Sequence, residues 1–351
     1  NQYALIHMLA SQHQNITVVG DDDQAIYSWR GANVRFLFEF ERDFPTVRTV
    51  KLEQNYRSSP RILSFANRLI QNNRQRKDKT MWTDRQEGEP IILLRTRSRE
   101  EEAAQIADLI LFLRKHHPEW LPLAVLYRIN AQSLHFETEF LSRGISFRIL
   151  KGQRFFDRKE VRDALALLRL ALQPEDDLAF RRVVEALPLG IGSKTLDLLA
   201  QQAAEAHASL WQTLVSQHPQ KIKSKEGLMA IHRLQQSPPE TFADLLEQLF
   251  VSSGLQAYLE ERREDGRILN VRELVAFIRD WEQHTPDPSF TALTDLISLD
   301  SSEADTDESL DAYLLTMHNA KGMEFPSVAS VGTNPSYLPF FLRKGSSEIE
   351  E

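Results

Sequence analysis

The sequence contains no cysteine among its 351 residues, which excludes disulfide bonds, thiolate catalysis and cysteine-based zinc sites. Its ten histidines show neither HExxH nor HxH spacing, so we expect no structural metal. No apolar run approaches membrane-spanning length. We therefore expect no membrane association, no signal peptide and a cytoplasmic location.

A phosphate-binding loop of the form GxxxxGK[ST] is also missing. The nearest match, GIGSKT at residues 190–195, lacks the four-residue gap and the Gly-Lys pair. The net charge of −8 argues by itself against a nucleic-acid binder. A motor protein can, however, confine its basic residues to one groove while its outer faces stay acidic. The length and the apolar fraction of 42% favour two or three domains.

The stretch that organises the chain is GDDDQAIYSWRGA at residues 20–32, directly after the short apolar run at 16–19. Loops at strand ends of α/β sheets are common ligand sites. The amide of Gln24 and the guanidinium of Arg30 can hydrogen-bond to phosphate oxygens. The acidic triplet before them is, by itself, more typical of a solvated turn or a helix cap than of a metal site.

Two aromatic residues in the same stretch, Tyr27 and Trp29, can stack on nucleobases at about 1–3 kcal/mol each. The simpler interpretation of an isolated aromatic pair is a strand-to-helix turn with both rings in the core. Both interpretations remain open at the level of this stretch alone.

Hydrophobic periodicity predicts strands that alternate with helices, which is typical of parallel α/β layers. The predicted strands lie at residues 16–19, 47–52, 91–94, 123–127, 147–150, 313–317 and 328–331. The predicted helices between them lie at residues 33–46, 61–71, 101–115 and 133–141. The basic run at 73–79 is interpreted as a solvated linker, and residues 158–305 as almost wholly helical.

Four segments resemble signature motifs of superfamily 1 DNA helicases of the UvrD, PcrA and Rep type, in that family's order. Residues 20–32 resemble GDDDQSIYxWRGA with Ala25 for the usual serine, and residues 52–58 resemble LxxNYRS. Residues 126–133 resemble LYRxNAQS, and residues 316–326 resemble TxHxAKGLEFP with Met323 for the usual leucine. Two weaker matches are residues 151–161, similar to GxxFFxRxEI, and the glycine turn at 187–195.

The resemblance implies an α/β fold with two RecA-like parallel-sheet domains, the first incomplete, and a mostly helical inserted subdomain. The implied segments are residues 1–83 for the C-terminal part of the first motor domain, 84–157 and 306–351 for the two parts of the second, and 158–305 for the insertion. It further implies an internal piece without the Walker A, Walker B and final arginine-finger motifs. We therefore expect negligible ATPase activity from these 351 residues alone.

By the same resemblance, the implied cofactors are ATP and Mg²⁺, with the metal ligands expected in a missing N-terminal part. Gln24 and Arg57 are the implied catalytic residues, where Gln24 senses the γ-phosphate and Arg57 acts as an arginine finger. Tyr56 is expected to stack on the adenine and Glu324 to bind the ribose.

The implied DNA-binding residues fall into two groups. Contacts with the single strand are implied for Tyr27, Trp29, Arg30, Asn130 and His318. Contacts with duplex backbone are implied for Gly190, Gly192 and Thr195, although a plain glycine turn between helices fits that segment equally well. The family usually carries arginine where this chain has Leu134, so one phosphate contact is in doubt.

The resemblance implies that the intact protein is an ATP-dependent 3′–5′ DNA helicase, which couples hydrolysis to movement along single-stranded DNA and duplex unwinding. Its expected partners are single-stranded DNA, duplex junctions and repair or replication proteins. Two alternatives remain open. One is a non-enzymatic nucleic-acid-binding or partner-docking module, and the other is a helicase–nuclease subunit of the same superfamily.

Overall fold

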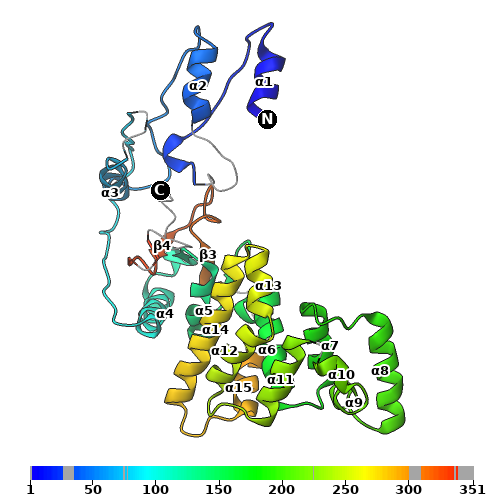
Figure 1. Ribbon diagram of the computed structural model, residues 1–351. Coiled ribbons are helices and arrows are strands. Elements are labelled where there is room, and N and C mark those ends of the chain that lie inside the picture. The colour runs from blue at the N-terminus through cyan, green and yellow to red at the C-terminus, as the bar shows by residue number, and fades with distance from the viewer. Residues whose placement is uncertain are drawn as a thin grey trace. The chain divides into compact units, whose positions relative to one another are not determined.

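The computed structural model describes residues 2–26, 35–73, 76, 78–223, 225–299, 310–335 and 337–338 (Figure 1). The chain divides into two compact units, which we describe separately. Unit 1 comprises Asn1–Arg95 with Pro339–Glu351, and unit 2 comprises Thr96–Leu338. Within the described ranges, no helix combines the length and the apolar character needed to cross a membrane.

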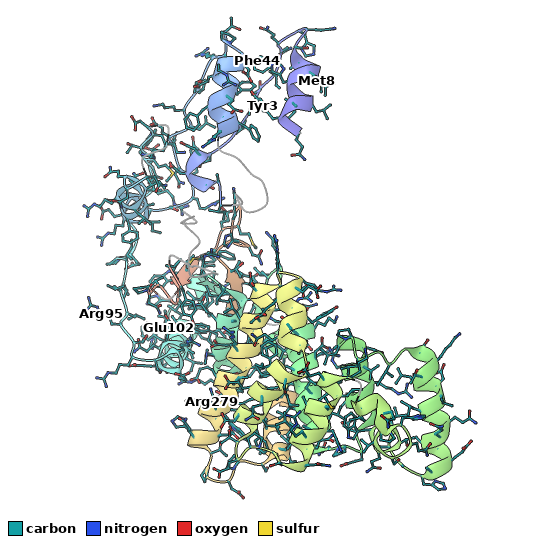
Figure 2. All side chains as sticks on the ribbon, viewed as in Figure 1. Tyr3, Met8, Phe44, Arg95, Glu102 and Arg279 are labelled. Carbon is teal, nitrogen blue, oxygen red and sulfur yellow. The ribbon has the colours of Figure 1, made fainter. Side chains whose placement is uncertain are left out.

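Unit 1 contains short helices around a small apolar core. Its elements are α1 (Gln2–Ala10), the 3-10 turn η1 (Asp22–Gln24), α2 (Arg35–Asp43) and α3 (Pro60–Ile70). Ala10, Phe40 and Phe44 form the buried core between α1 and α2. The Tyr3 hydroxyl donates a hydrogen bond of 2.8 Å to Asp43, which joins the same two helices. Tyr3 and Phe44 are labelled in this part of the chain in Figure 2.

Three strands predicted in this part of the chain, at residues 16–19, 47–52 and 91–94, are wrong. These stretches form no sheet ladder, and their apolar side chains are exposed, with Val19 at 83% and Leu52 at 79%. A strand requires a neighbouring strand that accepts and donates its backbone hydrogen bonds. The described residues of unit 1 supply only one isolated parallel bridge, between Gln54 and Trp82.

Unit 2 is built on a four-stranded, all-parallel sheet with the order β2-β3-β1-β4. The strands are β1 (Leu123–Tyr127), β2 (Phe147–Ile149), β3 (Ala312–Thr316) and β4 (Ser327–Ser330). Leu123 lies opposite Ala312 on one side and Ser327 on the other, so the central strands start level with one another. All four carboxyl ends therefore meet at the same edge of the sheet.

Two helices pack on this sheet through a shared apolar core. They are α4 (Arg99–His116) and α5 (Ser133–Ser142), and each contributes fully buried residues, such as Ile110 and Phe140. The 3-10 turns η3 (Pro118–Trp120), η4 (Asn130–Gln132) and η5 (Phe155–Asp157) connect the elements. The strands and helices predicted between residues 101 and 150 are confirmed, with bounds that differ by two residues or fewer.

Between β2 and β3 the described residues are mostly helical, as predicted for this stretch, which we call the insertion. Its helices are α6 (Lys159–Leu172), α7 (Asp177–Ala186), α8 (Ser193–Ala206), α9 (Leu210–Gln217), α10 (Pro219–Lys223), α11 (Glu226–Gln236), α12 (Phe242–Ser252), α13 (Leu255–Glu261), α14 (Asp265–His284) and α15 (Phe290–Leu299). Their large core includes Leu134 of α5 together with Phe155 and Phe156. Because this core reaches α5, the insertion packs directly on the sheet layer of unit 2. The α/β class is confirmed by this unit.

Candidate functional site

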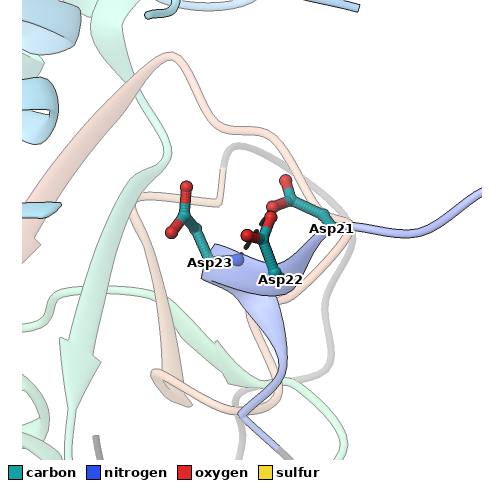
Figure 3. A group of neighbouring side chains, drawn as sticks. All are labelled: Asp21, Asp22 and Asp23. Atoms are coloured by element: carbon teal, nitrogen blue, oxygen red, sulfur yellow. Dashed lines mark hydrogen bonds between the residues drawn. The ribbon is translucent and has the colours of Figure 1, made fainter. Parts of the chain in front are cut away.

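The acidic turn of unit 1 is a compact 3-10 turn in which three aspartates lie side by side. Asp21 caps η1, and its carboxylate accepts the backbone N–H of Asp23 at 3.1 Å (Figure 3). The amide of Gln24 donates to the other oxygen of Asp21. The side chain of Gln24 is exposed at the rim of this turn.

Two cations from the basic run cover the acidic turn. Lys79 Nζ lies 2.9 Å from Asp22 and 3.2 Å from Asp23, and it also contacts Asp21. Arg76 forms a bidentate pair with Asp23, at 3.1 Å and 3.0 Å. The side chains of Arg76 and Lys79 are only 12% and 19% exposed, so the prediction of a solvated linker is wrong for these two residues. The ion pairs with the three adjacent aspartates stabilise Arg76 and Lys79 more than full exposure of these cations to water would.

The three carboxylates of this turn could bind either the Lys79 ammonium or a metal ion. Burial lowers the pKa of Lys79, but hydrogen bonds to the three aspartates outweigh it and raise that pKa above its usual value. Ligand oxygens of the three aspartates lie within 4.8 Å of one another, a spacing compatible with a cation. The Lys79 ammonium contacts all three carboxylates, so the cluster is better explained as an ion-paired turn than as a metal centre.

The NYRS loop of unit 1 presents an exposed aromatic ring beside an exposed arginine. The Asn55 side chain accepts the N–H groups of Arg57 and Ser58 at 2.9 Å and 2.8 Å, which forms an Asx turn. Arg85 donates to the carbonyls of Tyr56 and Arg57 and holds the loop from the other side. The Tyr56 side chain is 75% exposed, so its face is available for stacking.

The structure places the predicted nucleotide residues of unit 1 on exposed loops. Gln24, Tyr56 and Arg57 all have exposed side chains. Glu324, also exposed, belongs to unit 2, so its approach to the other three stays a prediction. The predicted DNA contacts Tyr27, Trp29 and Arg30 lie outside the described residues.

The carboxyl edge of the unit 2 sheet gathers basic and polar side chains. β1 continues into Arg128, β2 into Lys151 and β3 into His318. Arg128 Nη1 lies 3.5 Å from His318 Nδ1. Lys151 Nζ donates to the Asn319 carbonyl while the Asn319 amide donates to the Lys151 carbonyl, both at 3.1 Å, so the loops after β2 and β3 are tied together.

The loop after β1 is ordered by Gln132 and leaves Asn130 exposed. Gln132 Oε1 accepts the N–H groups of Arg128 and Ile129, both at 3.0 Å. Its amide packs against Gly332, directly after β4, where an added Cβ would lie 1.9 Å from Nε2. The structure thus brings Asn130 and His318 to one edge of the sheet. Their role as DNA contacts stays a prediction.

Leu134, where the family usually carries arginine, is fully buried in the core of the insertion. It packs in the same cluster as Phe155, so this position contributes no phosphate contact in this chain. Its burial explains why the apolar residue is compatible with the fold.

The predicted duplex-binding turn lies in the insertion, at the start of α8. Gly190 has a positive φ of 70°, and Gly192 caps the helix in an extended conformation. Leu189 and Ile191 anchor the turn in the core, at 5% and 8% exposure, while both glycines face solvent. Thr195 donates its N–H to the Gly192 carbonyl at 3.0 Å. The N–H groups of the first helical turn can donate hydrogen bonds to an anion.

Sequence reasoning missed three residues that organise these loops. Lys79 could have been found from the charge complementarity between the basic run and the acidic triplet. Gln132 lies within the segment 126–133 that resembles LYRxNAQS, but nothing in that pattern indicates that its side chain accepts the backbone N–H groups of the loop. Arg85 carries no sequence signal, because its partners are two backbone carbonyls almost thirty positions away.

Comparison with known proteins matches the sequence to one family. Residues 50–351 match the family model of the UvrD-like helicase C-terminal domain, and residues 1–45 match the UvrD/REP helicase N-terminal domain. DNA helicase II of Escherichia coli strain K12 is 38% identical over 353 residues, covering 96% of this chain and 49% of that protein. ATP-dependent DNA helicase PcrA of Staphylococcus aureus strain MRSA252 is 33% identical over 367 residues, covering 100% of this chain and 50% of that protein.

The chain spans about half the length of the curated relatives it matches. The family model of the C-terminal domain alone covers most of the sequence, including the sheet of unit 2, the insertion and the NYRS loop. The chain therefore belongs to the UvrD-like helicase family.

Proposed function

We propose that the intact protein is an ATP-dependent DNA helicase that moves 3′ to 5′ along single-stranded DNA and unwinds duplexes. The observation that carries this proposal is the convergence of Arg128, Asn130 and His318 at the carboxyl edge of the unit 2 sheet, in a chain of this family. Relatives named DNA helicase II and ATP-dependent DNA helicase PcrA support it. Single strands, duplex junctions and repair or replication proteins are the partners that this function requires.

The family resemblance assigns the nucleotide contacts to four side chains that are all exposed. ATP, when bound, supplies the phosphoryl group whose transfer to water drives movement. The Tyr56 ring would stack on the base, and Arg57 would stabilise the charge that develops on the γ-phosphate. Gln24 would hydrogen-bond near that phosphate, and Glu324 would accept hydrogen bonds from the ribose hydroxyls.

Magnesium would be held by residues other than the acidic triplet. Lys79 pairs with the carboxylates of Asp21, Asp22 and Asp23, and Arg76 pairs with Asp23, so a divalent ion would have to displace these cations. We therefore assign no metal ligand to the acidic triplet, and the chain by itself is expected to hydrolyse ATP negligibly.

The DNA path would run along the carboxyl edge of the sheet. The guanidinium of Arg128 and the ammonium of Lys151 suit phosphate oxygens, and the exposed Asn130 amide can hydrogen-bond to a phosphate or a base. Tyr27 and Trp29 would stack on bases, and Arg30 would contact phosphate. The turn formed by Gly190, Gly192 and Thr195 would hold duplex backbone at the start of α8.

Substitution of Arg57 in the intact protein tests the proposed enzymatic function. Arg57→Ala should lower the rate of DNA-stimulated ATP hydrolysis by about 10³-fold, because the developing charge on the γ-phosphate loses its cation. Binding of a fluorescent ATP analogue should be largely retained. Arg61→Ala serves as the control, since Arg61 is an exposed arginine nearby that pairs with Glu87 at 2.9 Å.

Hydrolysis that survives in Arg57→Ala removes this residue from the site. If the intact wild-type protein binds DNA but hydrolyses no ATP, the non-enzymatic alternative is correct instead.

A further inference from the structure

A buried arginine lies where the sheet of unit 2 passes into the insertion. Arg158 stands between η5 and α6, and its side chain is 9% exposed. Its guanidinium lies 5.0 Å from the ring centre of Phe155. A buried arginine is stable only if its donors are satisfied, so its partners indicate what it holds in place.

The partners of Arg158 define the loop that carries Asn130. Nη1 donates 2.9 Å to the Asn130 carbonyl, and Nη2 donates 2.8 Å to Ser133 Oγ. Ser133 Oγ in turn donates 3.0 Å to the same carbonyl. The backbone of Asn130 is therefore fixed from the interior, while its side chain is exposed to solvent.

The same guanidinium connects the loop to the helices of the insertion. Nη1 also lies 3.3 Å from Asn270 Oδ1 on α14, and Asn270 donates 2.6 Å to Glu160 on α6. The buried carboxyl group of Glu137 on α5 lies 4.0 Å from Nη2. One side chain thus joins η4, α5, α6 and α14.

We propose that Arg158 is a positioning residue for the DNA contact of Asn130, an inference that rests on the proposed function. The arginine fork and Ser133 together fix the peptide plane at Asn130 and therefore the direction in which its amide side chain leaves the loop. Lysine cannot replace this fork, because its ammonium lacks the planar pair of donors that reaches a carbonyl and a hydroxyl at once.

A double-mutant cycle on single-strand affinity tests the inference. The 351-residue chain is titrated against a fluorescein-labelled oligothymidylate, and the anisotropy gives Kd for wild type, Arg158→Lys, Asn130→Ala and the double variant. Arg158→Lys should raise Kd by about fivefold to tenfold in the wild-type background, but by less than about twofold in the Asn130→Ala background. A general loss of stability would instead act equally in both backgrounds.

Two further variants make the cycle decisive. Arg162→Lys on α6 is the matched control, because Arg162 is 51% exposed and pairs with Asp157 at the surface, and it should leave Kd unchanged. Ser133→Ala removes the second donor to the Asn130 carbonyl and should show the same dependence on Asn130. It replaces Arg158→Lys in the cycle if circular dichroism shows that the lysine variant does not fold.

The outcomes separate the two proposals. If Asn130→Ala alone leaves Kd unchanged, the DNA contact and the inference both fail. If Asn130→Ala weakens binding while Arg158→Lys has the same effect in both backgrounds, the DNA contact stands and the positioning role of Arg158 is overturned.

Discussion

Lys79 is the residue on which the acidic turn of unit 1 depends. Its ammonium contacts Asp21, Asp22 and Asp23, and Arg76 shares only the last of these. Three adjacent carboxylates repel one another unless cations compensate them. The turn that leads into the predicted phosphate-sensing residue Gln24 is therefore held by an electrostatic contact across more than fifty positions of sequence.

Removal of this cation should destabilise unit 1 and create a cation site. Lys79→Met is expected to cost about 1–3 kcal/mol of unfolding free energy, because it leaves partly buried carboxylates without their donor. Added Mg²⁺ should recover part of that loss in the variant and change little in wild type. Thermal denaturation followed by circular dichroism, with Lys51→Met as the exposed control, measures both effects. Equal responses to Mg²⁺ in variant and wild type would contradict this account.

Glu137 is a second residue whose buried environment changes the pKa of its side chain. Complete burial raises the pKa of its carboxyl above the ordinary 4.5, and the opposing effects of Arg158, Ser133 and the Phe155 N–H do not cancel this. The Glu137 carboxyl group therefore binds a proton more tightly in the folded state than in the unfolded state. The contribution of protonated Glu137 to the unfolding free energy is fully present below pH 4.5, and it is lost as the pH rises through the raised pKa of Glu137.

Glu137→Gln isolates this effect because glutamine cannot titrate. The unfolding free energy of wild type minus that of the variant should decrease as the pH rises from 4.5 toward neutrality. Urea denaturation of both proteins over this pH range gives the difference in unfolding free energy. The pH-dependent contributions of the other carboxylates are the same in both proteins and cancel in this difference. A difference that increases with pH would mean that Arg158 holds the pKa of Glu137 below its usual value.

At the scale of elements, the sheet of unit 2 depends on a contact between the loops after β1 and β4. Gly332 has a positive φ of 62°, and the Gln132 amide occupies the space that a Cβ would need. Gln132 cannot simply move away, because its Oε1 holds the N–H groups of Arg128 and Ile129. The loop that presents Asn130 therefore requires glycine at position 332, in the loop that follows β4.

Gly332→Ala should destabilise unit 2 more than a glycine replacement of equal backbone strain. We expect a loss of about 2–4 kcal/mol, since strain adds to two broken hydrogen bonds. Gly144 is the matched control, because its φ is 61° and no atom lies within 4 Å of an added Cβ. Gly144→Ala should cost only the strain, about 1–2 kcal/mol. Equal losses in urea denaturation would show that the Gln132 contact contributes nothing.

The strands show which elements the sequence could predict. The run at 123–127 matches β1 because it is buried between β3 and β4, where its apolar pattern and its pairing agree. The runs at 16–19, 47–52 and 91–94 have the same apolar pattern but no ladder among the described residues. Periodicity identifies a segment able to pair, whereas pairing depends on a partner elsewhere in the chain.

The site residues also divide into those that the sequence motifs identified and those that no sequence pattern indicated. The motifs identified Asn130 and His318 as separate DNA contacts, and the structure places both after neighbouring parallel strands, whose exits lie together. Their contact with DNA stays a prediction. The supporting residues Arg85, Gln132 and Arg158 escaped prediction, because they act through backbone carbonyls and N–H groups that no side-chain pattern records.

At the scale of the whole molecule, a net charge of −8 coexists with a basic sheet edge. Arg128, Lys151 and His318 lie at that edge. Arg143, just after the far end of α5, is instead neutralised by Asp108 and by Glu139 at 2.6 Å. Overall acidity therefore does not exclude a local path for a polyanion.

The most direct test of this account is the salt dependence of single-strand binding by the chain. Anisotropy titrations of a labelled oligothymidylate over a range of KCl concentrations should give a log Kd that rises with log salt. Arg128→Gln should reduce that slope by about one, as expected for one lost phosphate contact, while Arg143→Gln should leave it unchanged. Binding that is absent or independent of salt, or an equal slope in Arg128→Gln and wild type, would contradict a DNA path along this edge.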